Sequence, residues 1–190
     1  EGWRWYQDSV AAESSRQFYS AFELADGGDL PAAQEQLNQL IAEGSGKYPV
    51  LGQFAQAALL AREGNTEEAL AAYDAIATTQ SDQRLRDLAF LLAGNVLVDS
   101  GDVAAVEARV GGLISADNAM RNAAREILGL TQYAAGEGDA ARVTFRAIFE
   151  DNQASIEQLQ RIQLFDAQLE AEGAADPAPA ETAEATDAAE

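Results

Sequence analysis

The chain has 190 residues, of which 47% are hydrophobic but only 7% are aromatic, so its interior must consist mainly of alanine and leucine. It contains no cysteine and no histidine, which excludes imidazole bases, thiol nucleophiles and zinc sites built from these residues. Its 12 basic residues are dispersed among 32 acidic ones, and the formal net charge of -20 argues against binding to nucleic acid or anionic lipid. We therefore expect a non-catalytic protein that holds no metal and no cofactor.

Hydrophobic periodicity and helix-end signals predict an all-α chain without strands. Pro31 and Pro49 stand at helix starts, where a missing backbone N–H loses no partner. Gly111-Gly112 interrupts the sixth predicted helix, which we expect to be bent or short. In chain order, helices are expected over residues 6–27, 31–44, 49–63, 66–80, 83–100, 103–115, 118–136, 140–151 and 154–171.

Four glycine-centred corners recur between these helices at spacings of 36, 37 and 37 residues. Each glycine is expected to end a helix in the left-handed conformation, and the Asp or Asn after it to cap the next helix. A fixed period of this size is typical of a solenoid, in which each helix pair buries its apolar face against its neighbours. The corners are Gly28-Asp29, Gly64-Asn65, Gly101-Asp102 and Gly138-Asp139, and the compact apolar residues five positions after their glycines are Ala33, Ala69, Val106 and Val143.

The second corner has the most specific pattern. Asn65 and Glu68 have the spacing of a capping box, and the segment over residues 64–76 resembles the tetratricopeptide repeat, whose turn and second helix carry Gly, Asp or Asn, Ala and an aromatic residue at these offsets. Gly94, seven residues before the third corner, lies where that family has a small residue at a helix crossing. The resemblance predicts a tetratricopeptide-like solenoid of antiparallel helix pairs over residues 7–172, with about four repeats plus a C-terminal capping helix.

The last predicted helix carries a single apolar stripe, with polar residues on its other faces. Ser155 and Gln158 have capping-box spacing at its start. A terminal repeat needs a polar outer face, so we expect this helix to close the solenoid; alternatively, it docks a partner helix. The stripe consists of Ile156, Leu159, Ile162, Phe165 and Leu169.

The composition changes abruptly at Gly173. Residues 173–190 contain neither a basic nor a bulky apolar side chain, so burial cannot repay the entropy of ordering them. This segment is predicted to be a disordered acidic tail. Its five carboxylates leave most of the net negative charge on the helical body.

Aromatic and basic residues gather at the N-terminus, where Trp3, Arg4, Trp5 and Tyr6 begin an amphipathic run. Such residues are favoured at the boundary between a bilayer and water. We expect residues 1–6 to be a membrane-proximal segment, with any membrane-spanning helix preceding Glu1. The alternative is that these aromatic side chains pack on the first repeat or on a neighbouring molecule.

The segment Gly2-Trp3-Arg4-Trp5-Tyr6, the segment over residues 48–55 (YPVLGQFA) and the four-corner layout together resemble the ancillary SecYEG translocon subunit family (YfgM-like). The resemblance implies one N-terminal transmembrane helix followed by a tetratricopeptide-like domain that faces the periplasm at the bacterial inner membrane. It also implies protein partners, namely the SecYEG channel and a periplasmic chaperone of the PpiD type. The function implied is a non-catalytic interaction module that links the translocon to chaperones for secreted or membrane clients.

The tetratricopeptide register places one strip of residues on the concave face formed by the first helices of the pairs. Apolar residues of this strip would bind apolar groups of an extended or helical partner segment. The side-chain amides of the strip would form hydrogen bonds with the partner backbone, and Arg62 would form an ion pair with a partner carboxylate. The alternative is that the aromatic residues are core residues between helix pairs. The predicted protein-binding residues are Phe18, Phe22, Phe54, Arg62, Leu91, Asn95 and Gln132, and Ala58, Asp99 and Leu128 lie on the same strip.

Two other functions fit the same pattern. A tetratricopeptide-like protein of outer-membrane or envelope assembly would act as an adaptor or would self-associate, through its tryptophan-rich end or through the stripe of the last helix. An enzyme would have to work with carboxylates alone, and it would need a pocket in which they converge with perturbed pKa values.

Overall fold

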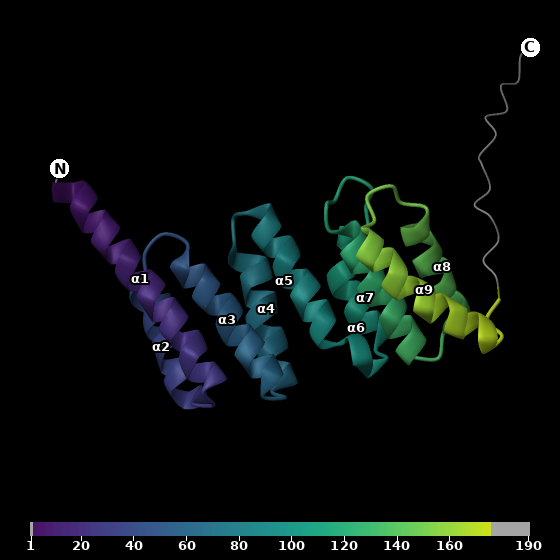
Figure 1. The fold of residues 1–190 in the computed structure, drawn as a ribbon, viewed down its shortest axis with the longest axis horizontal. Helices are drawn as coiled ribbons and strands as arrows, with labels where there is room; N and C mark the ends of the chain where they lie inside the picture. Colours follow the sequence, from purple (N-terminus) through teal and green to yellow (C-terminus); the bar gives the residue numbers. More distant parts are fainter. Residues whose placement is uncertain (1, 176–190) are drawn as a thin grey trace, which may run out of the picture.

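The computed structural model describes the backbone of residues 2–175 and the side chains of residues 11–175. In this part the chain is helical and has no strand, and antiparallel helices follow one another along the long axis from α1 to α8 and α9 (Figure 1). The predicted all-α solenoid is confirmed. The helices are α1 (Gly2–Asp26), α2 (Leu30–Glu43), α3 (Tyr48–Arg62), α4 (Thr66–Thr79), α5 (Gln83–Val96), α6 (Val103–Val110), α7 (Arg121–Ala134), α8 (Gly138–Phe149) and α9 (Ile156–Ala171), with short 3-10 helices η1 (Val98–Ser100) and η2 (Gly111–Leu113) after α5 and α6.

Most predicted helix ends lie within two residues of the observed ones, and the differences have local causes. α6 gives way to a 3-10 turn at Gly111, as the two glycines predict. α7 begins at Arg121, three residues later than expected, because the side-chain oxygen of Asn118 accepts a hydrogen bond from the backbone N–H of Met120 and holds a turn there. α1 begins at Gly2, four residues earlier than expected.

The first three corners have the predicted glycine conformation. Gly28, Gly64 and Gly101 have φ angles of 86°, 80° and 69°, which a Cβ atom would oppose. The carboxylates of Asp29 and Asp102 cap α2 and α6 by accepting hydrogen bonds from the third backbone N–H after them.

The capping box predicted at the second corner is wrong. Asn65 precedes α4, but its side chain makes no capping hydrogen bond. Its amide instead donates to the carboxylate of Glu63, at 3.1 Å. The charged acceptor two residues away therefore competes with the helix for this side chain.

The fourth corner lies two residues earlier than predicted. Gly136 has the positive φ, 78°, and Glu137 is the N-cap, while Gly138 is the first residue of α8. Asp139 does not cap α8, and its carboxylate accepts a hydrogen bond from the N–H of Ala175. The shift puts Ala141, which is fully buried, at the position predicted for Val143, which is 57% exposed. The four close-packing residues are thus Ala33, Ala69, Val106 and Ala141, all with no exposed surface.

Within residues 11–175, four small core clusters follow one another along the solenoid. The first is built largely from alanine and leucine of α1, α2 and α3, as the composition predicts. Gly94 lies at a close crossing, because a Cβ atom there would come within 2.6 Å of Val110 Cγ1 on α6. Small residues thus let the helices approach closely, and the core is thin.

The terminal helix α9 buries most of the predicted stripe against α8. Ile162 and Leu169 are buried, and Leu159 and Phe165 are half-buried. Ile156 does not belong to the stripe, since it stands at the first turn of α9 and is 71% exposed. Ser155 accepts a hydrogen bond from the N–H of Gln158, as predicted.

Two predicted regions fall partly or wholly outside the described residues. The acidic tail lies there from residue 176 on, and so do the side chains of Trp3, Arg4, Trp5 and Tyr6, whose backbone belongs to α1. Among the helices that the structure describes, none has the length and apolar character needed to cross a bilayer.

Candidate protein-binding surface

A first hollow opens between α1 and α3, with α2 beneath it. It encloses about 110 Å³, and only one of its lining residues is charged. Phe22 stands at its edge, 45% exposed, with its ring packed edge-on against Phe18 at a centroid distance of 4.9 Å. The lining residues are Ala21, Phe22 and Ala25 of α1, Leu37 of α2, and Ala55, Ala58, Leu59 and Arg62 of α3.

Arg62 is held by the end of α1. Its guanidinium donates to the carbonyl oxygen of Ala25 at 2.7 Å and lies 3.6 Å from the carboxylate of Asp26. A cation at a helix C-terminus is stabilised by the unpaired carbonyl groups there. The contact therefore fixes the last turns of α1 and α3 relative to each other and sets the width of the first hollow.

A second hollow lies between α5, α7 and α9 and has a more mixed lining. Its acidic side chain, Glu126 of α7, accepts hydrogen bonds from Arg161 at 2.9 and 3.1 Å and from the side-chain amide of Gln158 at 2.7 Å. These bonds join α9 to α7 and form the wall of the hollow. The lining residues are Leu91, Leu92 and Asn95 of α5, Ala123, Glu126, Ile127 and Leu130 of α7, and Arg161 of α9.

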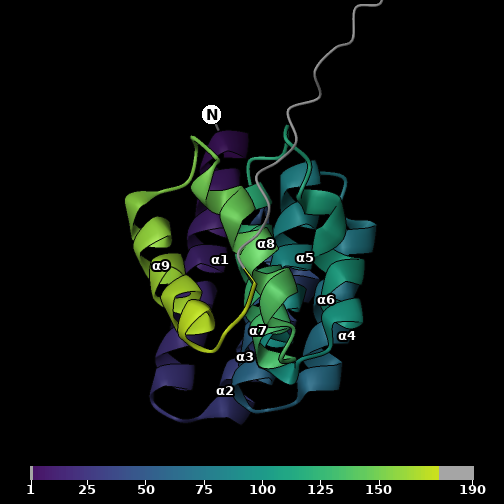
Figure 2. The ribbon, with the colours of Figure 1, turned by 90° about the vertical axis from the view of Figure 1, so that its right-hand side faces the viewer.

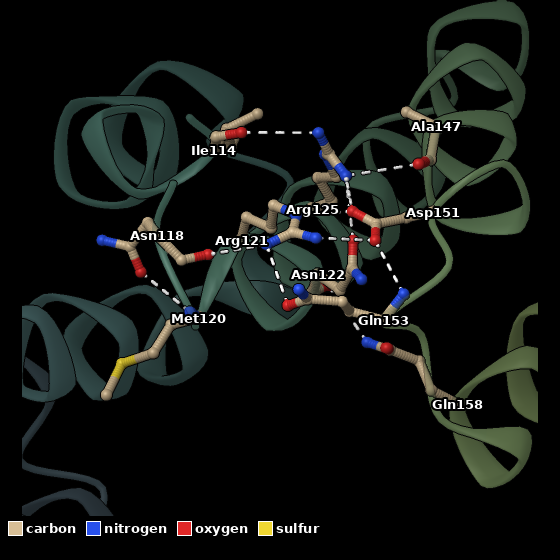
Figure 3. Close-up of polar contacts among 10 residues, drawn as sticks. All are labelled: Ile114, Asn118, Met120, Arg121, Asn122, Arg125, Ala147, Asp151, Gln153 and Gln158. Carbon is tan, nitrogen blue, oxygen red and sulfur yellow. Dashed lines mark hydrogen bonds and ion pairs between the residues drawn. The ribbon is translucent and has the colours of Figure 1, made fainter. Parts of the chain in front are cut away.

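A buried ionic cluster connects α7 to the loop that precedes α9 (Figure 3). The carboxylate of Asp151 accepts hydrogen bonds from Arg121 at 2.5 and 2.7 Å and from Arg125 at 2.9 Å. It also accepts one from the backbone N–H of Gln153. The hydrogen bonds from Arg121 and then from Gln153 hold the pKa of Asp151 well below its usual range. The carboxylate is therefore ionised at neutral pH and pins the α8–α9 loop to α7.

Gln158 extends this connection into α9. Its amide donates to the backbone carbonyl of Asn122 at 3.0 Å (Figure 3). It also donates to the carboxylate of Glu126. The ionic cluster and Gln158 together fix where α9 lies, and so they determine the shape of the second hollow.

A family model described as a tetratricopeptide repeat-like domain matches residues 1–171. The chain belongs to this family. A search of curated proteins and a search of solved structures each found no match. A tetratricopeptide repeat-like domain indicates a protein-interaction module, and the family is typically non-catalytic.

Five of the seven predicted binding residues fall into two groups in this tetratricopeptide repeat-like domain. Phe22 and Arg62 meet at the first hollow, with Phe18 packed behind Phe22. Leu91 and Asn95 meet at the second hollow. The predicted strip is thus present as two separate depressions in the domain surface, and binding by these residues stays a prediction.

Phe54 and Gln132 line neither hollow. Phe54 packs against Tyr73 at a ring-centroid distance of 6.4 Å and against the second core cluster. The side-chain oxygen of Gln132 accepts a hydrogen bond from Thr144 of α8 at 2.7 Å. Both side chains therefore already have partners inside the domain.

Sequence reasoning missed the residues that α7 and α9 contribute to the second hollow. Glu126 and Arg161 are separated by 35 residues, which is close to the repeat period, so they occupy similar positions in two first helices. Opposite charges one repeat apart are the signal that could have found them. Among the described residues, no group of three acidic side chains is placed to hold a metal ion.

Proposed function

We propose that this domain is the periplasmic interaction module of a protein anchored in the bacterial inner membrane. In this role it is ancillary to the SecYEG translocon and links the channel to a periplasmic chaperone of the PpiD type, for secreted or membrane clients. The second hollow carries the proposal, because it combines apolar side chains with an exposed amide and an ion pair, as polypeptide-binding surfaces do. The resemblance of residues 2–6 and 48–55 to the translocon-associated family supports the identity of the partners.

Site-specific photo-crosslinking in native membranes tests the proposal. A photoreactive amino acid is placed at Leu91 or Ala123 in the second hollow, or at Ala58 in the first. The matched controls are Ala71 on α4 and Ala104 on α6, which are exposed and line neither hollow. We expect adducts with a channel subunit or the chaperone from the hollow positions and none from the controls.

Three results would count against this function. Equal adducts from control and hollow positions would remove the hollows as the binding surface. Adducts only with outer-membrane or envelope-assembly proteins would favour the adaptor alternative. Protease digestion of the whole gene product in intact spheroplasts tests the location, because a periplasmic domain is degraded there and a cytoplasmic one is protected.

One observation favours self-association as a second candidate. Ile156 and Leu164 on α9 are 71% and 74% exposed, so this terminal helix presents two large aliphatic side chains that a second copy could cover. If they form an interface between two copies, the protein will be a dimer by light scattering, and Leu164→Gln will make it a monomer. A monomer at all concentrations excludes this function.

A further inference from the structure

Carboxylates stand at the corners that directly follow α1 and α3. The hollow uses the last turns of these helices, including Ala25 and Arg62. The corners that follow these turns lie along the lower edge of the solenoid (Figure 1). The acidic residues at these two corners are Asp26, Asp29, Glu63, Glu67 and Glu68.

Arg62 offsets only part of this negative charge, because it is one cation beside five carboxylates. It lies at the wall of the hollow, but its guanidinium is directed to the carbonyl of Ala25 and the carboxylate of Asp26. Among the residues whose side chains the structure describes, the lining of the hollow has no other cation. A partner segment that approaches this opening therefore meets apolar surface rimmed by net negative charge.

Two aromatic rings extend the apolar surface on the α1 side. Tyr19 is 66% exposed and Phe22 is 45% exposed. Phe22 is three positions after Tyr19 on the helix, and Asp26 follows Phe22 by about one turn, so all three lie on one side of α1. Exposed rings beside a carboxylate attract lysine and arginine, through the ring faces as well as through the charge.

We infer that the first hollow binds a basic amphipathic segment of a partner polypeptide. One apolar side chain of the segment enters between α1 and α3, and a neighbouring lysine or arginine lies beside Asp26 and the rings of Tyr19 and Phe22. This inference rests on the proposed role as a protein-interaction module, and it specifies the chemistry of the partner. The volume of about 110 Å³ suits one side chain, since a cavity of about 150 Å³ holds a benzene molecule.

Charge argues against two other occupants. An acidic segment would be repelled by the corner carboxylates, and Arg62 is already paired. A second copy of this chain would bring 32 acidic residues against only 12 basic ones, so the two copies repel each other at this edge.

Fluorescence anisotropy with the full chain and three labelled peptides tests the inference. The first peptide is a twelve-residue helix former with a central leucine flanked by four arginines. In the second peptide glutamates replace the arginines, and in the third a serine replaces the leucine. We expect binding of the first peptide that weakens as NaCl is raised, no binding of the second, and binding of the third that is weaker by about tenfold or more because the buried leucine is lost.

Two variants locate the binding site. Ala58→Gln puts a larger polar side chain at an exposed lining position of α3, and it should weaken binding of the first peptide by about tenfold. Asp26→Asn should weaken it severalfold and reduce its salt dependence. The matched controls are Ala71→Gln on α4 and Asp99→Asn at the third corner, both exposed and outside the lining of the hollow, and they should leave binding unchanged.

Several results would overturn the inference. Equal affinity for the acidic peptide would do so, as would Ala58→Gln binding like the wild type. A concentration-dependent dimer that Ala58→Gln abolishes would show that a second copy covers the hollow. Absence of binding to all three peptides, with crosslinking to translocon or chaperone components retained, would overturn the basic partner chemistry alone and leave the proposed function standing.

Discussion

Gly94 lies where the absence of a side chain lets α5 cross α6. A Cβ atom there would be 2.6 Å from Val110 Cγ1 and 3.4 Å from Ile127 Cγ2, and both neighbours belong to the third core cluster. Neither the branched valine nor the branched isoleucine has a free rotamer into which it can withdraw inside a packed core. This position therefore limits how closely the third helix pair can pack.

We expect Gly94→Leu to lower the free energy of unfolding by about 2–4 kcal/mol, because the added side chain overpacks this crossing. Thermal unfolding followed by circular dichroism measures the effect. Gly112→Leu is the control, since Gly112 is exposed and a Cβ atom there would meet no neighbour. An unchanged melting temperature for Gly94→Leu would mean that the crossing is looser than described.

The Asp151 cluster should make stability depend on pH in the acid range. The pKa of the Asp151 carboxylate is lowered in the folded protein, chiefly by hydrogen bonds from Arg121. The pKa of an aspartate in the unfolded chain is about 3.9. A lowered folded pKa stabilises the native state above the unfolded value, and this stabilisation is lost as the pH falls from about 4 toward the folded pKa.

We therefore expect Asp151→Asn to have a lower melting temperature than the wild type at pH 7. The difference between the two proteins should narrow as the pH is lowered from about 5 to about 2, since the unfolded wild-type chain takes up a proton at Asp151 in this range and the variant does not. Asp117→Asn, an exposed substitution in the loop before α7, serves as the control. A gap in melting temperature that stays constant down to pH 2 would show that the charge of Asp151 does not provide the stabilisation.

Single residues also mark the limit of what the sequence can predict. Gly94 was found because its distance from a corner fits a repeat register. Gly129 was not found, although a Cβ atom there would come within 2.4 Å of the ring of Phe145 on α8. The close contact depends on which helix lies opposite, and no local pattern records this.

At the scale of helices, the caps differ more than their sequences suggest. Asp102 accepts a hydrogen bond from the N–H of Ala105 at the start of α6, a helix of only eight residues. Asn65 occupies the N-cap position of α4, but its side-chain amide donates a hydrogen bond to Glu63 instead of capping the helix. The two corners therefore make a matched pair for measuring the contribution of a cap.

Asp102→Ala should cost about 1 kcal/mol of stability, the usual value for loss of an N-cap. Asn65→Ala should change stability by less than about 0.5 kcal/mol, because no cap is lost and the hydrogen bond from the Asn65 side-chain amide to Glu63 is exposed. Urea unfolding of both variants gives the comparison. Equal losses would mean that Asn65 caps α4 in solution.

Helix existence was predictable because apolar residues recur with helical period and because Gly, Pro and Asp mark the ends. The fourth corner was misplaced because Gly136-Glu137-Gly138-Asp139 offers two glycines that are two positions apart, and both fit a repeat of about 36 residues. The chain uses the earlier one, since α7 ends at Ala134. A choice between neighbouring glycines is made by packing, here by the burial of Ala141 in place of Val143.

At the scale of the molecule, the solenoid places different helices on its two sides and gathers carboxylates along one edge. Seen along the long axis, α1 and α9 lie toward one side and α4 and α6 toward the other (Figure 2). The sequence register places its predicted binding residues on α1, α3, α5 and α7, and residues of these helices line the two hollows. It did not predict that the face divides into two hollows, because the division depends on Arg62 at α1 and on Glu126 and Arg161 between α7 and α9.

The corners form one acidic edge, because every first helix ends there and every second helix begins there. Carboxylates near helix starts are favourable to each helix singly. However, the edge carries Asp26 and Asp29 at the first corner, Glu67 and Glu68 at the second, Asp99 and Asp102 at the third, and Glu137 and Asp139 at the fourth. These carboxylates and the net charge of -20 repel one another in the folded state, and this repulsion lowers the stability of the whole solenoid.

Salt should therefore stabilise this protein. Raising NaCl from about 10 mM to about 150 mM shortens the Debye length from about 30 Å to about 8 Å, which screens repulsion between corners more than the close buried pairs around Asp151. We expect the melting temperature at pH 7 to rise by about 2–4 °C, equivalent to about 1 kcal/mol for a domain of this size. KCl should act like NaCl, whereas sulfate is unsuitable because it stabilises proteins by exclusion from their surface. A fall in melting temperature would mean that exposed pairs such as Arg161 with Glu126 stabilise the fold by more than the acidic edge destabilises it.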